Sequence, residues 1–278
     1  MPLILPGNVA SATAGAYSIA NSCRFNDDDG AHLTKTLGTP TNVDRWTVSY
    51  WIKRGKIGGD QCVFAAGTSS SNEEKAATFK GSSTEDQFYW QQYISSSETG
   101  VLLTNQLFRD PAAWYHFVLT YDSGNGTAGN RMRMYVNGTE VTSFATDTNP
   151  TQNLDSLINS NVAHYIGCDR ATNADFDGYM AEFILCDGQA YAASDFGEFD
   201  EDSPTIWKPK DPSGLTFGDN GFWLDFEDSS ALGNDVSGNN NDWTANNLAA
   251  TDSSTDTPTN NFATWNPILR HHSSMTLA

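Results

Sequence analysis

The acidic residues are the first candidates for a catalytic role, because two carboxylates on one strand can hydrolyse a glycosidic bond. Such a strand carries its acids on alternating residues, as in Glu-x-Asp-x-x-Glu. The nearest string is EFDEDS at residues 198–203, where Ser203 stands in the final position and Pro204 follows directly. A solvated acidic linker explains this composition better than a catalytic strand does.

Histidine and serine give no better basis for catalysis. The sequence has no Gly-x-Ser-x-Gly elbow of the kind that presents a nucleophilic serine. His116 lies between Tyr115 and Phe117 in an alternating segment, which is typical of a packed sheet residue rather than of a base. His32 and His164 are isolated. We therefore assign no catalytic residue and expect a protein that is not an enzyme.

Calcium is the candidate cofactor, since Asp and Asn side chains combine with backbone carbonyls in its oxygen sites. The candidate ligands are Asp27, Asp29, Asp175 and Asp177. None of them has the spacing of an EF-hand loop. Because Asp and Asn also favour turns for backbone reasons, the sequence leaves both interpretations open.

Glycan binding would use exposed aromatic side chains that stack on sugar rings. Trp90 and Tyr93 are the candidate glycan-binding residues, and Trp223 and Trp243 are further possibilities. Each of them could equally fill a hydrophobic core. The polar segments 67–75, 95–100 and 145–161 are predicted as loops that would form such a site.

We expect β-strands to position these candidates, because apolar and polar residues alternate with a period of two along much of the chain. In WTVSYWIK, residues 46, 48, 50 and 52 share one face. WYHFVLTYD (114–122) and RMRMYV (131–136) alternate in the same way, and HYIG and GYMAEFILC add strands at 164–167 and 178–186. Asn137-Gly138 favours a two-residue type I′ hairpin turn, followed by a returning strand from Thr139 to Phe144. The expected class is an all-β antiparallel sandwich.

Composition excludes several functions. The formal charge is −19, with 15 Lys and Arg against 34 Asp and Glu, so neither a nucleic acid nor an acidic membrane surface is an expected partner. No apolar run is long enough to span a bilayer, and the first residues lack the positive region of a signal peptide. The four cysteines form no CxxC pair; we expect buried thiols, although a disulfide is also compatible.

The order of four motifs resembles the laminin-G-like jelly roll of the concanavalin A-like superfamily. A W-x-H strand (114–116), a YVNG hairpin (135–138), an IG strand end (166–167) and an FDGxxxE strand (176–182) follow one another as in that family. The resemblance covers residues 21–195. It implies a sandwich there, and it implies that calcium, where bound, sits at the rim.

The remaining segments are predicted as an N-terminal arm at 1–20, a linker with a probable closing strand at 196–248 and a C-terminal arm at 249–278. The string DVSGNNND (235–242) is similar to a turn of the same family, and the alternative is that residues 221–248 begin a second module.

Together with the string DTPTNNFATWNP (256–267), the jelly roll resembles virion-associated proteins of marine bacteriophages. That resemblance implies a structural protein of the virion, made in the host cytoplasm, that decorates a capsid or forms part of a head or tail fibre. Its partners would be capsid or tail subunits and further copies of itself, with a trimer as one candidate. The alternative function is a carbohydrate-binding adhesion module for host surface glycans.

Overall fold

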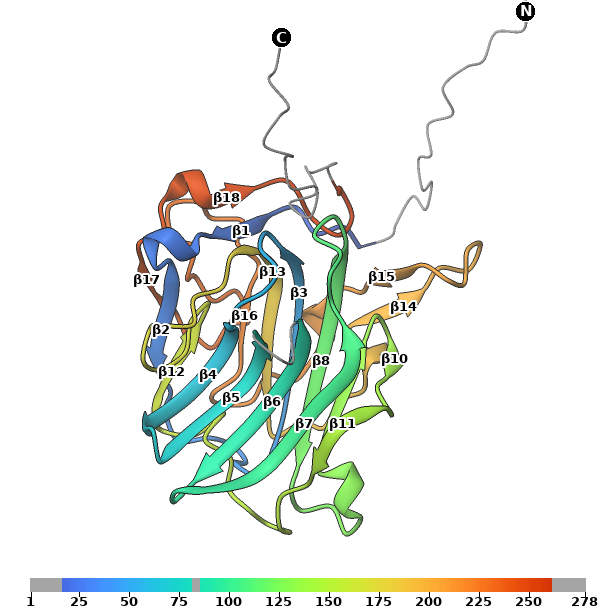
Figure 1. Cartoon of the computed structure of the whole chain (residues 1–278). Coiled ribbons are helices and arrows are strands. Elements are labelled where there is room, and N and C mark those ends of the chain that lie inside the picture. Colours follow the sequence, from blue (N-terminus) through green and yellow to red (C-terminus); the bar gives the residue numbers. More distant parts are fainter. Residues whose placement is uncertain (1–16, 82–85, 262–278) are drawn as a thin grey trace, which may run out of the picture.

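The computed structural model describes residues 17–81 and 86–261. Two antiparallel sheets of eight strands each pack face to face, as Figure 1 shows, which confirms the predicted all-β sandwich. Short 3-10 helices connect some strands: η1 (Asp27–Asp29), η3 (Ala128–Asn130), η4 (Ala193–Asp195), η5 (Pro212–Gly214) and η6 (Ala250–Asp252).

Each large sheet combines strands from distant parts of the chain. Sheet A contains, in spatial order, β10 (Thr139–Glu140), β9 (Met132–Val136), β8 (Trp114–Asp122), β3 (Arg45–Arg54), β13 (Gly178–Asp187), β1 (Ser22–Phe25) and β18 (Ser253–Ser254), with β16 (Phe222–Leu224) also paired to β13. Sheet B contains β11 (Phe144–Thr148), β7 (Ser97–Leu107), β6 (Gln87–Ile94), β5 (Asn72–Phe79), β4 (Gln61–Ser69), β12 (Ala163–Ile166), β2 (His32–Thr36) and β17 (Thr244–Asn246).

The main core fills the space between the sheets with the side chains that alternation predicted. Trp46, Val48, Tyr50 and Ile52 of β3 are all fully buried there. They meet side chains of the facing sheet; Trp46, for example, lies 5.3 Å from Trp90 between ring centroids. The period of two in the sequence therefore identified the inner face of this strand correctly.

The predicted hairpin after β9 has the expected turn, but its returning strand is shorter than predicted. Asn137 and Gly138 have φ values of 47° and 79°, as a type I′ turn requires. The returning strand β10 ends at Glu140, however, and Phe144 begins β11 in the other sheet. The chain thus crosses between the sheets where a single continuous strand was predicted.

Two of the predicted loops are largely strand. Residues 67–75 contain the end of β4 and the start of β5, joined by a tight turn, and residues 95–100 contain the start of β7. Their polar composition misled the prediction because this end of sheet B has side chains that face solvent or polar partners. Only 145–161 is mostly loop, after β11 ends at Thr148.

Sheet A has a second hydrophobic layer on its outer face, formed by segments that the sequence suggested were a linker and an arm. The apolar side chains of this layer that lie in the predicted linker are Phe196, Trp207, Leu215, Phe217 and Trp223. Ile19 joins the layer from the N-terminal side, in one hydrophobic cluster with Trp51 and Trp114. Because of this cover, the outward side chains of β3 are buried as well.

Residues after 196 add strands to both sheets and do not form a separate module. β16 pairs with β13 of sheet A, and β17 pairs with β2 of sheet B. The turn before β17 is fixed by the Asp235 carboxylate, which accepts hydrogen bonds from the backbone N–H groups of Trp223, Ser237 and Asn241. Residues 249–261 also pack on the sandwich through η6 and β18, so the described part of the predicted C-terminal arm is folded against the body.

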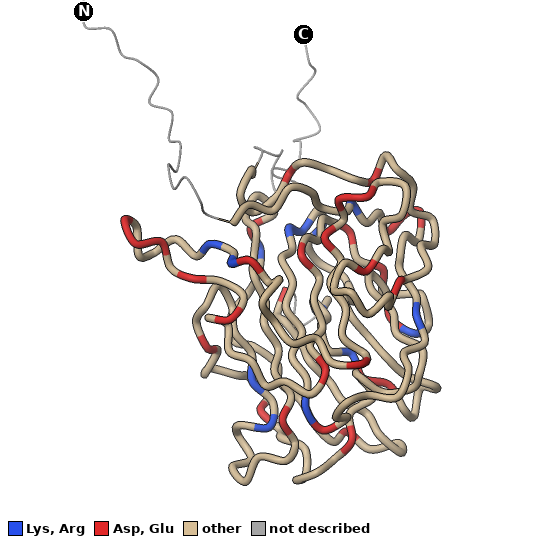
Figure 2. Tube along the Cα trace, turned by 180° about the vertical axis from the view of Figure 1, so that it is seen from behind, with Lys and Arg blue, Asp and Glu red and all other residues tan. Residues whose placement is uncertain are grey.

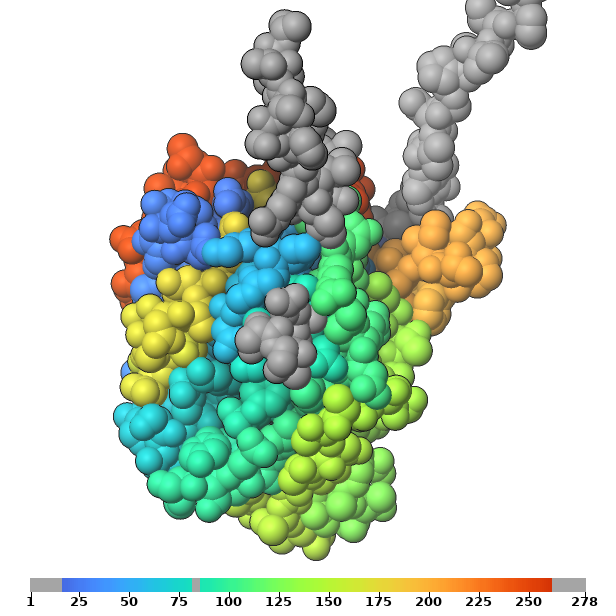
Figure 3. Space-filling view, viewed as in Figure 1, coloured from blue at the N-terminus to red at the C-terminus, as the bar shows by residue number. Residues whose placement is uncertain are grey.

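One small hairpin lies outside both large sheets. β14 (Gly197–Phe199) and β15 (Trp207–Pro209) pair only with each other within the described residues. The hairpin projects from the body in orange in Figures 1 and 3. Figure 2 shows acidic residues at its tip and across the rear of the molecule, with far fewer Lys and Arg. No helix in residues 17–81 and 86–261 is long and apolar enough to cross a membrane.

Candidate functional site

The two described ends of the chain lie side by side at one pole of the sandwich. Thr259 Oγ1 accepts a hydrogen bond from Ile19 N–H and donates one to Ile19 O, both at 3.1 Å. Next to this contact, β18 pairs with β1. We call residues 17–22 and 253–261 the terminal pole. Figure 1 places it at the top of the molecule.

A buried ion pair fixes the terminal pole to the sandwich. Lys53 of β3 is 1% exposed and Asp256 is 5% exposed, and Lys53 Nζ lies 2.8 Å from Asp256 Oδ2. The other carboxylate oxygen of Asp256 accepts a hydrogen bond from Trp114 Nε1 at 3.1 Å, and its backbone oxygen accepts one from Ser22 Oγ. Both charges need these partners because an unpaired charge is costly in the interior.

A second polar contact holds the N-terminal side of the pole. Tyr17 donates its hydroxyl proton to Glu182 Oε1 at 2.8 Å, and Trp223 Nε1 donates to Glu182 Oε2 at 2.6 Å. Glu182 lies within a β-bulge of β13, between Ala181 and Ile184, and has a φ of 49°. Its burial raises the pKa of the carboxyl group to about 8, and the nearby acids Asp225 and Glu227 act in the same direction.

Three of the four predicted calcium ligands have other polar partners in this structure. Asp177 pairs with Arg24 at 2.8 Å, and Asp27 pairs with Lys56. Asp29 accepts a hydrogen bond from Asn26, while burial raises the pKa of Asp175. Nowhere in residues 17–81 and 86–261 do three His, Cys, Asp or Glu side chains gather as metal ligands.

The two predicted glycan-binding residues lie on opposite faces of β6. Trp90 is fully buried in the core and donates its indole proton to Glu74, so it cannot stack on a sugar. Tyr93 is half-buried on the outer face, together with Tyr89 and Gln91. Tyr89 was not among the predicted candidates. Residues an odd number of positions apart lie on opposite faces of a strand, and residues an even number apart share a face. Tyr93 is three residues from Trp90 but four from Tyr89, so the sequence itself places Tyr93 and Tyr89 on the same face.

The described histidines, His32, His116 and His164, make hydrogen bonds within the fold. An indole N–H is a donor only, and Trp207 Nε1 lies 2.9 Å from His116 Nδ1, so the imidazole proton is on Nε2 and is donated to Ser49 Oγ at 2.8 Å. His116 therefore has no free nitrogen with which to activate Ser49. Burial lowers the pKa of His116 to about 3 and that of His164 to about 4, so both rings are neutral.

The cysteines are buried free thiols in the described chain, which agrees with the expectation from their spacing. Burial raises the pKa of each thiol, to about 12 for Cys62. They are consequently protonated and poor nucleophiles.

Comparison with known proteins places this architecture in a family. Residues 25–191 match the Laminin_G_3 family model, described as the concanavalin A-like lectin/glucanases superfamily. The chain belongs to this family, which confirms the resemblance seen in its motifs. No curated protein matches the sequence.

Solved structures share the fold at low sequence identity. A putative carbohydrate binding protein from Bacteroides ovatus is similar with a TM-score of 0.54 and 15% identity, over 86% of this chain and 60% of that one. A heptameric SAP-like pentraxin from Limulus polyphemus is similar with a TM-score of 0.45 and 14% identity, over 64% of this chain and 80% of that one. The enzymatically active domain of bacteriophage CBA120 tailspike protein 2 has a TM-score of 0.45 and 11% identity, over 69% of this chain and 30% of that one. This chain spans less than two thirds of the Bacteroides ovatus protein and of the tailspike domain.

Proposed function

We propose that this protein is a non-enzymatic structural component of a bacteriophage virion, attached to the particle through the segments that flank the terminal pole. The observation that supports this proposal is the hydrogen-bonded contact between Ile19 and Thr259. Residues 1–16 and 262–278 lie outside the described residues, but each is covalently continuous with that pole. A neighbouring subunit that binds both segments would hold the sandwich by one end.

Three features of the protein support a role in attachment and display. Lys53 and Asp256 fix the attachment end to the sandwich by a buried contact, so a load on the flanking segments reaches the body. The formal charge of −19 favours solubility where many copies stand close together on a surface. His116, which lies 2.8 Å from Ser49 Oγ, has its other ring nitrogen engaged by Trp207 Nε1.

The test is incorporation of a truncated chain into particles. In a phage that lacks its own copy of the gene, the full chain and a chain without residues 1–16 are supplied during infection, and the copies per purified particle are counted by mass spectrometry. The truncation keeps Tyr17 and Ile19, so it retains every contact of the terminal pole described above. We expect it to unfold at the same denaturant concentration as the full chain and to be absent from particles.

The possible outcomes separate two parts of the proposal. Normal incorporation of the truncated chain would contradict attachment through residues 1–16. Absence of the full chain from particles would contradict the virion assignment itself. A homo-oligomer, with a trimer as one candidate, is a further part of the proposal, and the mass of the purified full chain in solution tests it.

A carbohydrate-binding module for host glycans is the second candidate function. The observation in its favour is the row of Tyr89, Gln91 and Tyr93 on the outer face of sheet B. Aromatic rings beside amide groups match the apolar faces and hydroxyls of sugars, and the Bacteroides ovatus structure of the same fold supports this candidate. A glycan array with the purified chain tests it, and loss of any signal in a Tyr89→Ala/Tyr93→Ala variant is the expected result.

A further inference from the structure

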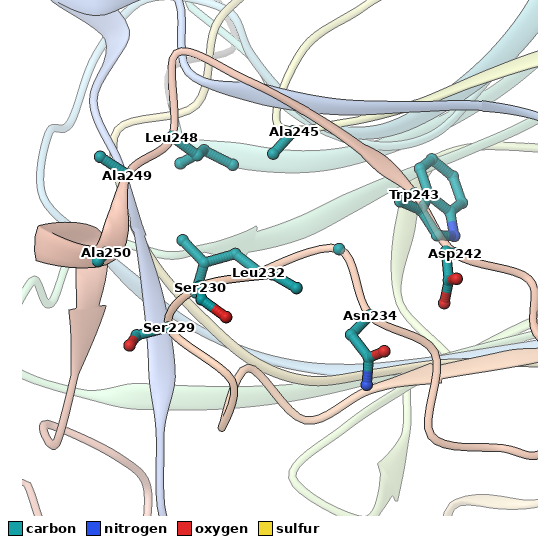
Figure 4. A pocket seen from close by; sticks show the side chains of 12 residues that line it. Ser229, Ser230, Leu232, Asn234, Asp242, Trp243, Ala245, Leu248, Ala249 and Ala250 are labelled. Atoms are coloured by element: carbon teal, nitrogen blue, oxygen red, sulfur yellow. The ribbon is translucent and has the colours of Figure 1, made fainter.

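A buried group of reactive side chains lies where the terminal pole meets β3, and it differs from an open surface hollow. The hollow in Figure 4 is lined by residues between Ser229 and Ala250, and its polar side chains Ser229 and Asp242 are exposed, so they select no ligand. At the terminal pole, by contrast, a carboxylate and a primary amide converge on one amine, Lys53 Nζ. These three groups are the components of an amide-forming reaction.

The amine and the amide carbon lie within reach of each other. Lys53 Nζ donates a hydrogen bond to Asn261 Oδ1 at 2.8 Å. Since a C=O bond is about 1.2 Å long, Nζ lies no farther than about 4 Å from Asn261 Cγ. Reacting atoms in a near-attack arrangement are about 3–3.5 Å apart. Asn261 Nδ2 donates to Ala112 O at 3.1 Å, so the amide group is also held from its other end.

Asp256 is positioned to carry protons for this reaction. Its Oδ2 lies 2.8 Å from Lys53 Nζ, and its Oδ1 accepts a hydrogen bond from Trp114 Nε1 at 3.1 Å, which fixes the orientation of the carboxylate. Lys53 is 1% exposed and Asp256 is 5% exposed. A proton transfer from Nζ to Oδ2 turns this ion pair into a neutral pair, which is compatible with a buried site. It also leaves the amine with the lone pair that a nucleophile needs.

We propose that Lys53 and Asn261 form an intramolecular isopeptide bond, with Asp256 as the proton carrier. One proton passes from Lys53 Nζ to Asp256 Oδ2, and the amine lone pair forms a bond to Asn261 Cγ. A second Nζ proton moves to Nδ2, the bond between Cγ and Nδ2 breaks, and ammonia leaves. Ammonia takes the proton from Asp256 and departs as ammonium, which restores the carboxylate. Asn261 is exposed, so the leaving group passes directly into water.

The structure shows the chain before this reaction, with Lys53 and Asp256 as an ion pair. Because the amine is charged in that pair, the reaction should be slow, and a freshly purified chain should be unlinked. The bond joins residues 208 positions apart and ties the terminal pole to β3. A covalent link across so long a segment restricts the unfolded chain, so the linked form should melt about 10 °C higher. The inference does not depend on attachment to a virion.

Intact mass spectrometry of the purified full chain tests the proposal. The folded chain is incubated for several weeks at pH 8, and we expect its mass to fall by the mass of one ammonia. Trypsin does not cut after an acylated lysine. Digestion should therefore yield a branched peptide in which Lys53 is joined to Asn261, and fragmentation of that peptide identifies the two linked residues.

Matched variants assign the reaction to these side chains. Asn261→Ala changes an exposed residue and should show no loss of ammonia. Asn260→Ala, at the neighbouring exposed position, should become linked at the rate of the unsubstituted chain. Asp256→Asn keeps an oxygen for Trp114 but carries no proton, so it should slow the reaction about 100-fold or more. A thermal melt of each variant confirms that it is folded.

Two outcomes would overturn the proposal. One is an unchanged mass in a chain that stays folded throughout the incubation. The other is a loss of ammonia that yields no branched peptide or that persists in Asn261→Ala. Asparagine also loses ammonia when its side chain closes on its own backbone as a succinimide, and this second outcome would assign the loss to that reaction.

Discussion

Replacement of Asp256 by alanine should be among the most damaging single changes at the terminal pole. The substitution removes the carboxylate that lies 2.8 Å from Lys53 Nζ, at a place where Lys53 is 1% exposed. Loss of one partner of a buried ion pair costs about 3–5 kcal/mol. The lost acceptor for Trp114 adds about 1 kcal/mol. Asn261 Oδ1, which also lies 2.8 Å from Lys53 Nζ, keeps part of the solvation of the ammonium group.

We therefore expect Asp256→Ala to lower the free energy of unfolding by about 4 kcal/mol. The assay is equilibrium unfolding in guanidinium chloride, followed by tryptophan fluorescence. With a denaturant dependence of roughly 4 kcal/mol per molar, the midpoint should fall by about 1 M. Asp27→Ala is the matched control, because it breaks the pair with Lys56 at the surface and should cost less than about 1 kcal/mol.

A double substitution tests the electrostatic reasoning. Lys53→Met with Asp256→Leu removes both charges and keeps side-chain volume, so it should recover most of the loss. The reasoning is refuted if Asp256→Ala costs no more than Asp27→Ala, or if the double variant is no more stable than Asp256→Ala.

Three further predictions concern other buried groups. The pKa of Glu182 is raised from 4.5 to about 8 in the folded state. Between these pH values folding takes up a proton, so the free energy of unfolding should fall as the pH rises from about 5 to 8. Glu182→Gln, which mimics the protonated acid, should remove this pH dependence, and an unchanged pH dependence would locate its origin in another group. Trp207→Phe removes the proton donor to His116 Nδ1 and should lower the free energy of unfolding by about 1–3 kcal/mol; a thermal melt checks this, and a matched melt of Ser213→Ala at the surface should not move. The four buried thiols should not react with an aromatic disulfide reagent at pH 8 until denaturant is added; rapid labelling of the native chain would contradict their burial.

The inner face of the sandwich was predictable because it depends on local alternation. Trp46 and Tyr50 share a face of β3 whatever the rest of the chain does, and a sheet must bury its apolar face. The second, outer layer was not predictable in this way. Trp207 and Ile19 cover β3 from distant positions in the sequence, and nothing in WTVSYWIK indicates that its second face is also covered.

The candidate sites were less predictable than the fold for a related reason. Asp27 and Asp177 have the composition of metal ligands, but each faces a cation, Lys56 or Arg24, that comes from a different strand or loop. The contact between Lys53 and Asp256 joins residues 203 positions apart, so no motif announces it. Alternation within FYWQQY, by contrast, already contained the information that Trp90 and Tyr93 point in opposite directions.

The closeness of Ile19 and Thr259 has a consequence for protein engineering. A chain whose entry and exit points are neighbours can be inserted into a surface loop of another protein without stretching it, and its ends can be joined to make a circular permutant. New ends could then be opened at the exposed tip of the β14–β15 hairpin, where residues 201 and 202 are exposed. Such a permutant should keep both sheets, because the cut avoids every strand of the sandwich.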